Sequence, residues 1–296
     1  MVSVRCCVIV ISSVATFTAS LAHATDAGRW TAEEVKVVTG LSVPECVCPD
    51  PSQGNAYVSN IEAEKDAYWD NDGKGFISLI ASDGSMQELR WLDSAPDAIM
   101  NSPKGMGLLG DYLYFSDNAR LMRCSTKPPR QLEVVKIPPA QRLNDVGTDG
   151  RAVYLTDTAL GLIYRVAPDG GVRRLAAPPS VNGVAFHKEH MYAVSWDAHD
   201  VFELDPEGKA EPKPFGVSEH FTNLDGIEVL DDGTFIVSDF IGNKVCAIAP
   251  DRKTVYTLAE VETPADMGLD RDRSLLYVPL FMKDQVVVYR LERAGN

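Results

Sequence analysis

Short runs of apolar and β-branched residues alternate with turn residues along almost the whole sequence. In the segment 152–175, the runs 152–156, 162–166 and 172–175 are separated by turns, the last of them Asp169-Gly170-Gly171. Such runs are typical of strands, and no strong 3.6-residue periodicity competes with them. We therefore predict an all-β protein. A parallel α/β sheet is disfavoured because no amphipathic helix of 10 to 15 residues separates the strands.

A unit of roughly 40 residues repeats six times. Each unit opens with a short apolar strand that begins with one polar residue, here called a leading residue. The six leading residues are Glu45, Lys104, Asn144, Asn182, Asp225 and Asp266, separated by steps of 59, 40, 38, 43 and 41 positions. An aromatic residue follows each of them after 12, 10, 10, 10, 10 and 11 positions, namely Tyr57, Tyr114, Tyr154, Tyr192, Phe235 and Tyr277. This period predicts a six-bladed β-propeller with four-stranded blades.

The last unit runs out after the strand 286–289, with too little chain left for a fourth strand. The segment 34–38, Glu-Val-Lys-Val-Val, precedes the first leading residue and can supply that strand. Pairing the N-terminal strand into the last blade would close the ring and hide the open sheet edges. We expect one propeller domain over residues 25–296.

The first 24 residues have the features of a signal peptide. Arg5 supplies positive charge, residues 6–21 are mostly apolar or small, and Ala22-His23-Ala24 fits a cleavage site. Cleavage after residue 24 predicts a secreted or periplasmic protein without stable membrane insertion. An uncleaved anchor is disfavoured because several serines and threonines interrupt the segment. The chain carries 28 Lys and Arg against 42 Asp and Glu, a net charge of −14, which argues against a nucleic-acid partner.

Two other features of the sequence are weaker candidates for a metal site. Cys46, Cys48, Cys124 and Cys246 remain after cleavage, and we expect buried thiols, since a Cys-x-Cys pair without a nearby second pair is a poor zinc site. The first unit contains an insertion, residues 62–74, whose Asp70-Asn71-Asp72-Gly73 resembles the start of a calcium loop. Lysine and alanine occupy two later ligand positions, so a solvated hairpin turn is preferred there.

The leading residues carry the main candidate chemistry. Because the first strand of each propeller blade lies nearest the axis, they should face one another at one end of the channel. Three carboxylates, two amides and one ammonium group would meet, and unpaired buried charges are costly. A hard divalent cation would compensate, because Asp, Glu and Asn offer oxygen ligands. We predict Glu45, Asn182 and Asp225 as the core ligands, with Asn144 nearby.

An alternative needs no metal. The same side chains could form a ring of hydrogen bonds and salt bridges around ordered water, in which Lys104 neutralises Glu45 or Asp266. From the residues alone, both arrangements stay open.

Four short motifs resemble those of the regucalcin/gluconolactonase family of lactonases. They are Pro44-Glu45, Arg142-Leu143-Asn144-Asp145, Val181-Asn182-Gly183-Val184 and Leu224-Asp225-Gly226-Ile227. Members of that family are six-bladed propellers with a divalent cation on the axis, and the resemblance covers the mature chain in blade order. The chain departs from the family pattern at Cys46-Val47-Cys48, at the insertion 62–74 and at Lys104.

The resemblance implies roles for individual residues. Glu45, Asn182 and Asp225 would bind the cation, Arg142 and Asn144 would contact substrate, and Asp225 would transfer a proton. The expected activity is metal-dependent hydrolysis of a lactone or related ester, with Asp225 and Arg142 as catalytic residues. Arg142, Asn144, Lys104 and Asp266 are the expected substrate contacts. Calcium is the first choice of cation, with magnesium, manganese or zinc as alternatives.

A second class of function is retained. The chain could be a non-catalytic propeller that binds a ligand or a protein, with a structural cation or a salt-bridged channel, because propellers host many unrelated functions.

Overall fold

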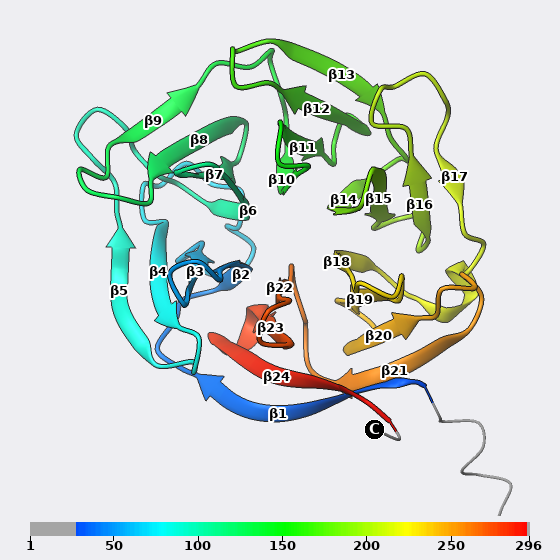
Figure 1. The fold of residues 1–296 in the computed structure, drawn as a ribbon. Coiled ribbons are helices and arrows are strands. Elements are labelled where there is room, and N and C mark those ends of the chain that lie inside the picture. Colours follow the sequence, from blue (N-terminus) through cyan, green and yellow to red (C-terminus); the bar gives the residue numbers. More distant parts are fainter. Residues whose placement is uncertain (1–27, 295–296) are drawn as a thin grey trace, which may run out of the picture.

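The structure is a computed structural model that describes residues 28–294. It contains six four-stranded antiparallel sheets arranged around one axis, which confirms the predicted six-bladed β-propeller (Figure 1). The predicted signal peptide, residues 1–24, lies outside the described residues. Within residues 28–294, no helix has the length and apolar character needed to cross a membrane.

The six blades follow the sequence order, each with its first strand innermost. The first blade contains β2 (Pro44–Asp50), β3 (Asn55–Asn60), β4 (Phe76–Ala81) and β5 (Met86–Leu92). The second contains β6 (Pro103–Leu109), β7 (Tyr112–Asp117), β8 (Arg120–Ser125) and β9 (Leu132–Val135). The third contains β10 (Leu143–Thr148), β11 (Val153–Asp157), β12 (Leu162–Val166) and β13 (Val172–Ala176). The fourth blade contains β14 (Val181–His187), β15 (His190–Ser195), β16 (Val201–Leu204) and β17 (Lys213–Pro214). The fifth contains β18 (Leu224–Val229), β19 (Phe235–Asp239), β20 (Lys244–Ile248) and β21 (Val255–Glu260).

The sixth blade closes the ring as predicted. It contains β22 (Gly268–Asp270), β23 (Leu275–Leu280) and β24 (Gln285–Arg293), and its outermost strand is β1 (Trp30–Val38). β1 pairs antiparallel with β24 from Trp30 opposite Arg293 to Val38 opposite Val286. Figure 1 shows β1 running along the outside of β24. The N-terminal segment thus completes the last sheet and covers the edge that β24 would expose.

Aromatic residues at the start of the second strands pack between blades. Tyr57 lies in a buried cluster with Leu113 and Phe115 of the second blade. Tyr277 of the last blade lies in a cluster with Val58 of the first. The repeated aromatic position therefore contributes to the apolar contact between neighbouring blades, which accounts for its near-constant spacing in the sequence.

A second repeated residue fixes the loops that lead into the first strands. The last residue of the second strand is a fully buried aspartate in three blades, namely Asp117, Asp157 and Asp239. The Asp157 carboxylate accepts hydrogen bonds from the backbone N–H groups of Gln141 at 2.8 Å, Arg142 at 3.2 Å and Leu160 at 3.1 Å. Such charge-assisted bonds are strong, and they hold the chain just before the leading residue.

Replacing Asp157 with alanine should lower the free energy of unfolding by about 3 kcal/mol, because it leaves three backbone donors without this acceptor. Asp157→Asn retains one acceptor oxygen and should fall between the alanine variant and the native protein. Urea denaturation measures both. A loss below about 0.5 kcal/mol, the range of ordinary surface substitutions, would show that the carboxylate does not fix this loop.

Candidate functional site

The strand pairing brings five of the six predicted leading residues to equivalent positions. In each of these blades the residue before the leading residue pairs with the end of the second strand, and a register shift follows within the next three residues. These pairs are Pro44 with Asn60, Pro103 with Asp117, Leu143 with Asp157, Val181 with Ser195 and Leu224 with Asp239. One end of the channel therefore carries a ring of side chains, here called the axial ring, formed by Glu45, Lys104, Asn144, Asn182 and Asp225.

The sixth leading residue needs a correction. Pro264 pairs with Leu280 and Gly268 with Tyr277, so the leading position of the last blade belongs to Ala265. Asp266 lies one residue further along, in a bridge with Cys46. Its backbone N–H donates to the Glu45 carbonyl oxygen at 2.9 Å, joining the last blade directly to the first. A clue was present in the sequence: Tyr277 follows Ala265 by 12 positions, as Tyr57 follows Glu45.

Glu45 and Asp225 are two buried carboxylates with incomplete hydrogen bonding. Glu45 is 4% exposed and Asp225 is 6% exposed. Glu45 Oε2 and Asp225 Oδ1 have no hydrogen-bond partner. Burial, and then the charge of Asp225, hold the pKa of Glu45 well above its ordinary value. Burial, and then the charge of Asp145, raise the pKa of Asp225 to about 7, although a hydrogen bond with Asn182 acts in the opposite direction. A positive charge in contact with these two carboxylates would oppose both shifts.

Lys104 does not supply that charge by direct pairing. Its ammonium group donates to the carbonyl oxygens of Tyr68 at 2.9 Å and Ser102 at 3.1 Å, and to Asn118 Oδ1 at 3.4 Å. It also lies 3.9 Å from the centre of the Trp69 ring. Within residues 28–294, no ion pair joins it to Glu45 or Asp266. The direct contact that the metal-free alternative allowed between Lys104 and one of them is therefore not formed, although the Lys104 charge still acts to lower the pKa of Glu45. The alternative of a hydrogen-bonded polar ring stays a prediction.

Burial makes the ammonium group of Lys104 easier to deprotonate. Burial lowers the pKa of its ammonium group to about 8, although the nearby carboxylates of Glu45 and Asp117 oppose that shift.

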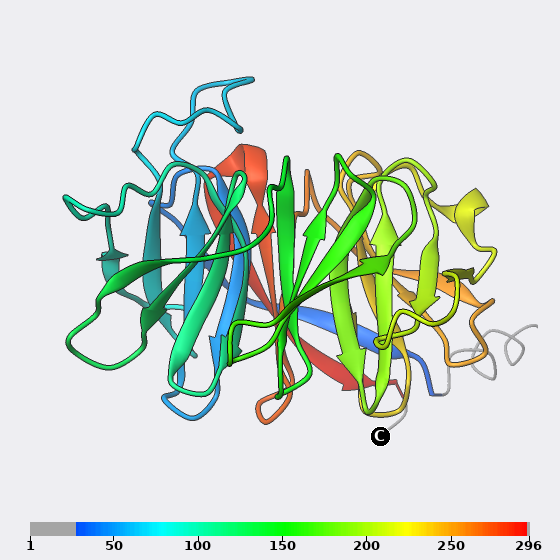
Figure 2. The same cartoon turned by 90° about the horizontal axis from the view of Figure 1, so that it is seen from above.

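The insertion 62–74 packs on the mouth of the channel and is more than the solvated turn that we expected. The Tyr68 ring meets Phe281 edge-on at 4.8 Å. The Asp70 carbonyl oxygen accepts bonds from Ser102 Oγ at 3.1 Å and Asn118 Nδ2 at 3.0 Å. In the side view of Figure 2 this segment rises above the rest of the propeller. These contacts place aromatic residues of the insertion beside the axial ring.

Arg142 and Asn144 both lie in the third blade, where the sequence placed them. Arg142 is exposed, and its guanidinium carbon lies 5.5 Å from the centre of the Trp69 ring. Asn144 is half-buried, and its carbonyl oxygen accepts a hydrogen bond from Ser116 Oγ. The exposed guanidinium is placed to meet a group that approaches from the solvent side of this blade.

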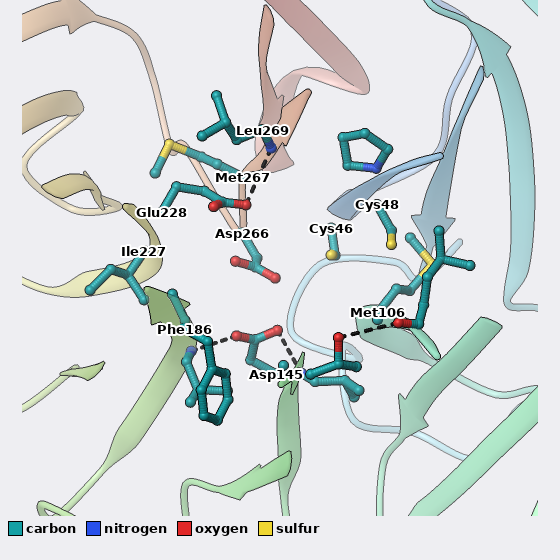
Figure 3. A pocket seen from close by; sticks show the side chains of 18 of the residues that line it. Cys46, Cys48, Met106, Asp145, Phe186, Ile227, Glu228, Asp266, Met267 and Leu269 are labelled. Atoms are coloured by element: carbon teal, nitrogen blue, oxygen red, sulfur yellow. Dashed lines mark hydrogen bonds between the residues drawn. The ribbon is translucent and has the colours of Figure 1, made fainter. Parts of the chain in front are cut away.

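A second polar layer lies directly below the axial ring, and the repeat pattern did not indicate it. It contains Cys46, Asp145 and Asp266 (Figure 3). The carboxyl groups of Asp145 and Asp266 share a hydrogen bond, and the Cys46 thiol also bonds Asp266. Burial, and then the charge of Asp145, raise the pKa of Asp266 well above its ordinary value. The motif Asn144-Asp145 is visible in the sequence, but no local pattern indicates that Asp145 belongs to a second polar layer.

Glycines occupy the same layer in three other blades because the strands approach closely there. A Cβ atom on Gly105 would lie 2.3 Å from the Cα atom of Asp145. One on Gly226 would lie 2.7 Å from Asp266 Oδ1. Only glycine permits this approach, so the glycines after the leading residues set the width of the channel.

The four cysteines of the described chain, Cys46, Cys48, Cys124 and Cys246, are buried and free. This confirms the expectation of buried thiols. Residues 28–294 contain no group of three or more His, Cys, Asp or Glu side chains arranged to hold a metal ion. A cation in the axial ring would therefore need amide oxygens, from Asn182 and Asn144, beside the two carboxylates. Oxygen donors of this kind suit a hard cation such as calcium.

Neither protein-family models nor curated protein sequences match this chain. Similar solved structures do exist, among them a streptogramin B lyase with 13% identity, a TM-score of 0.61 and coverage of 89% of this chain and 98% of the other. A catalytically inactive virginiamycin B lyase from Staphylococcus aureus, solved with quinupristin, shares 13% identity with a TM-score of 0.59, covering 88% and 99%. A protein suggested to be a gluconolactonase shares 17% identity with a TM-score of 0.64, covering 92% and 96%. At these identities the likeness supports the propeller fold alone.

Proposed function

We propose that this protein is a metal-dependent hydrolase of a lactone or related ester. The observation that carries the proposal is the pair of buried carboxylate oxygens, Glu45 Oε2 and Asp225 Oδ1, that have no hydrogen-bond partner. Leaving two such oxygens buried without compensation is costly, and a cation between them would remove the cost. One of the similar propellers is suggested to be a gluconolactonase, which agrees with the proposal without carrying it.

The residues present fit a hard divalent cation. Glu45, Asn182 and Asp225 would hold it, with Asn144 beside them, and calcium matches this set of oxygen donors. When bound, such a cation supplies Lewis-acid polarisation of the substrate carbonyl group. The substrate would be a small molecule, and the signal-like segment at the N-terminus supports a secreted or periplasmic location.

The chain's own residues would perform the proton transfer and orient the substrate. Asp225, ionised beside the cation, would accept the proton of an attacking water. The exposed Arg142 guanidinium can stabilise negative charge that develops on the carbonyl oxygen. Lys104 is bound to the insertion and contributes its positive charge at a distance, while Asp266 lies one layer below the ring. We therefore assign substrate contact first to Arg142 and Asn144.

The direct test combines metal analysis with a substrate panel. The purified mature protein should contain a stoichiometric divalent cation, and it should hydrolyse one class within a panel of sugar lactones and acyl lactones. Treatment with a chelator should abolish turnover, and calcium should restore it. Full turnover in protein shown to be metal-free would contradict the proposed mechanism.

A non-catalytic ligand-binding or protein-binding propeller is the second candidate. It is favoured by the deep burial of Glu45 and Asp225 and by the contact of the insertion with Lys104 at the channel mouth. In that case the cation would be present and would stabilise the fold, but the whole substrate panel would remain unhydrolysed. Metal content together with turnover therefore separates the two candidates.

A further inference from the structure

A cavity of about 640 Å³, here called the mouth pocket, lies between the insertion 62–74 and the loops of the second and third blades. Its lining includes Trp69, Asn71, Asn101, Arg120, Gln141 and Arg142. The pocket adjoins the axial ring, because the Trp69 ring lies 3.9 Å from the Lys104 ammonium nitrogen and Arg142 lies two residues before Asn144. A ligand bound at the axial ring can therefore extend into this pocket.

The one carboxylate among the lining residues of the mouth pocket is already compensated. Asp117 is fully buried and accepts hydrogen bonds from the backbone N–H groups of Asn101, at 3.0 Å, and Ser102, at 2.7 Å. It also accepts a bond from the Arg120 guanidinium group, which in turn donates to the Ile99 carbonyl oxygen at 2.6 Å. The charges of Asp117 and Arg120 are in contact, so together they add no net charge to the pocket.

Arg142 gives the mouth pocket an uncompensated positive charge. Its side chain is exposed, and within residues 28–294 its guanidinium group forms no ion pair or hydrogen bond. The contact that it does make is with the Trp69 ring, whose centre lies 5.5 Å from the guanidinium carbon. Gln141, the preceding residue, is also exposed. The guanidinium donors are therefore available to a ligand, and their planar arrangement matches the two oxygens of a carboxylate.

The two sides of the channel mouth differ in polarity. The residue that directly follows the second strand of each blade shows the difference. In the fourth, fifth and sixth blades this residue is Trp196, Phe240 and Phe281, which belong to one apolar cluster. In the second and third blades it is Asn118 and Thr158. A charged group of a ligand is therefore better matched on the side of the second and third blades, where the mouth pocket lies.

We propose that the mouth pocket binds a free carboxylate group of the substrate, so that the preferred lactones carry one carboxylate. This inference rests on the proposed function for the reacting end of the ligand. A guanidinium group has several N–H donors, so Arg142 can bond both carboxylate oxygens and still direct another N–H to the carbonyl oxygen. One uncompensated positive charge matches a monoanion. A phosphate group carries more negative charge and would be repelled more strongly by the buried Glu45 and Asp225.

Calorimetric titration of the calcium-loaded mature protein with 3-oxocyclopentane-1-carboxylate and with its carboxamide tests the inference. Both rings keep the carbonyl group of a lactone but have no ester bond to hydrolyse. The carboxylate should bind about tenfold more tightly than the carboxamide, or better, because a charge-assisted pair replaces a neutral hydrogen bond. Raising the NaCl concentration from about 50 mM to about 500 mM should reduce this affinity ratio, since salt screens exposed charges.

Four variants locate the carboxylate. Arg142→Gln removes the positive charge and should bring the affinity ratio of carboxylate to carboxamide close to one, whereas Arg142→Lys keeps the charge without the planar donors and should give an intermediate ratio. Gln141→Glu places a negative charge beside Arg142 and should lower the ratio about threefold. Gln87→Glu is the matched control and should keep the native ratio, because Gln87 is exposed on the outermost strand of the first blade. Thermal unfolding shows which variants fold, and Gln141→Glu decides the location if Arg142→Gln does not fold.

Turnover is measured in parallel with 5-oxotetrahydrofuran-3-carboxylate and its carboxamide, which are the lactones of the same shape. The carboxylate site is overturned if the native protein binds neither ring ketone, if it binds both equally, or if Arg142→Gln keeps the native ratio, even where neutral lactones are hydrolysed. A preference for the carboxylate that Arg142→Gln abolishes supports the site even if no lactone is hydrolysed. In that case the proposed hydrolase function fails and the binding site remains.

Discussion

Metal-free protein should lose stability as the pH rises from about 5 to about 8, and calcium should restore it. Burial raises the pKa of Asp225 to about 7 and holds that of Glu45 well above its ordinary value. In the unfolded chain these carboxyl groups titrate near pH 4. Between the two values the folded state binds protons that the unfolded state has released, so the free energy of unfolding falls with increasing pH. For Asp225 alone, a pKa that rises from about 4 to about 7 on folding corresponds to roughly 4 kcal/mol.

Urea denaturation at pH 5 and pH 8, with chelator and with calcium, measures this effect. In chelator the unfolding midpoint should be lower at pH 8, and calcium should raise it there far more than at pH 5, because protonated ligands bind the cation poorly. Asp145 and Asp266 change the stability in the same direction, since burial also raises their pKa values. The unfolding midpoint could instead rise with pH in chelator, or stay the same at pH 8 when calcium is added. Either result would mean that something other than a cation compensates the buried negative charge of the axial ring.

Asp225→Asn is expected to abolish function while stabilising the metal-free protein at pH 8. The substitution keeps the shape of the side chain but removes a buried charge that repels Glu45 and Asp145. It also removes the proposed proton acceptor and replaces a charged cation ligand with a neutral one, so kcat/KM should fall by about 10³-fold or more. Activity, calcium affinity and the unfolding midpoint in chelator are measured on the same preparation.

Asp239→Asn is the matched comparison for stability, because both aspartates are buried in the fifth blade. The Asp239 carboxylate accepts bonds from the N–H groups of Thr222, Asn223 and Gly242. Its replacement should therefore destabilise the protein, opposite in sign to Asp225→Asn. Asp111→Asn, on the surface, controls for the loss of one negative charge and should leave turnover unchanged. Native turnover in Asp225→Asn would remove this residue from the mechanism.

The architecture could be predicted because its signals are local and repeated. The aromatic residues at the start of each second strand marked the blades, and the valine-rich segment 34–38 before Glu45 indicated the closing strand. The aromatic position reflects side chains that must be buried between sheets wherever the same unit recurs. The repeat also placed Glu45, Lys104, Asn144, Asn182 and Asp225 at equivalent positions, because strand order alone brings first strands to the axis.

Details that depend on contacts between distant segments could not be predicted in this way. A one-residue difference in pairing gave the sixth leading position to Ala265 and moved Asp266 into a lower layer, since register depends on hairpin length as well as on motif. Lys104 bonds an insertion more than 30 residues earlier in the chain, which no local pattern indicates. The repeat pattern was enough to say which residues surround the axis. The depth of these side chains, their direction and their hydrogen-bond partners depend on how the six blades pack together, because each blade contributes contacts to the blades beside it.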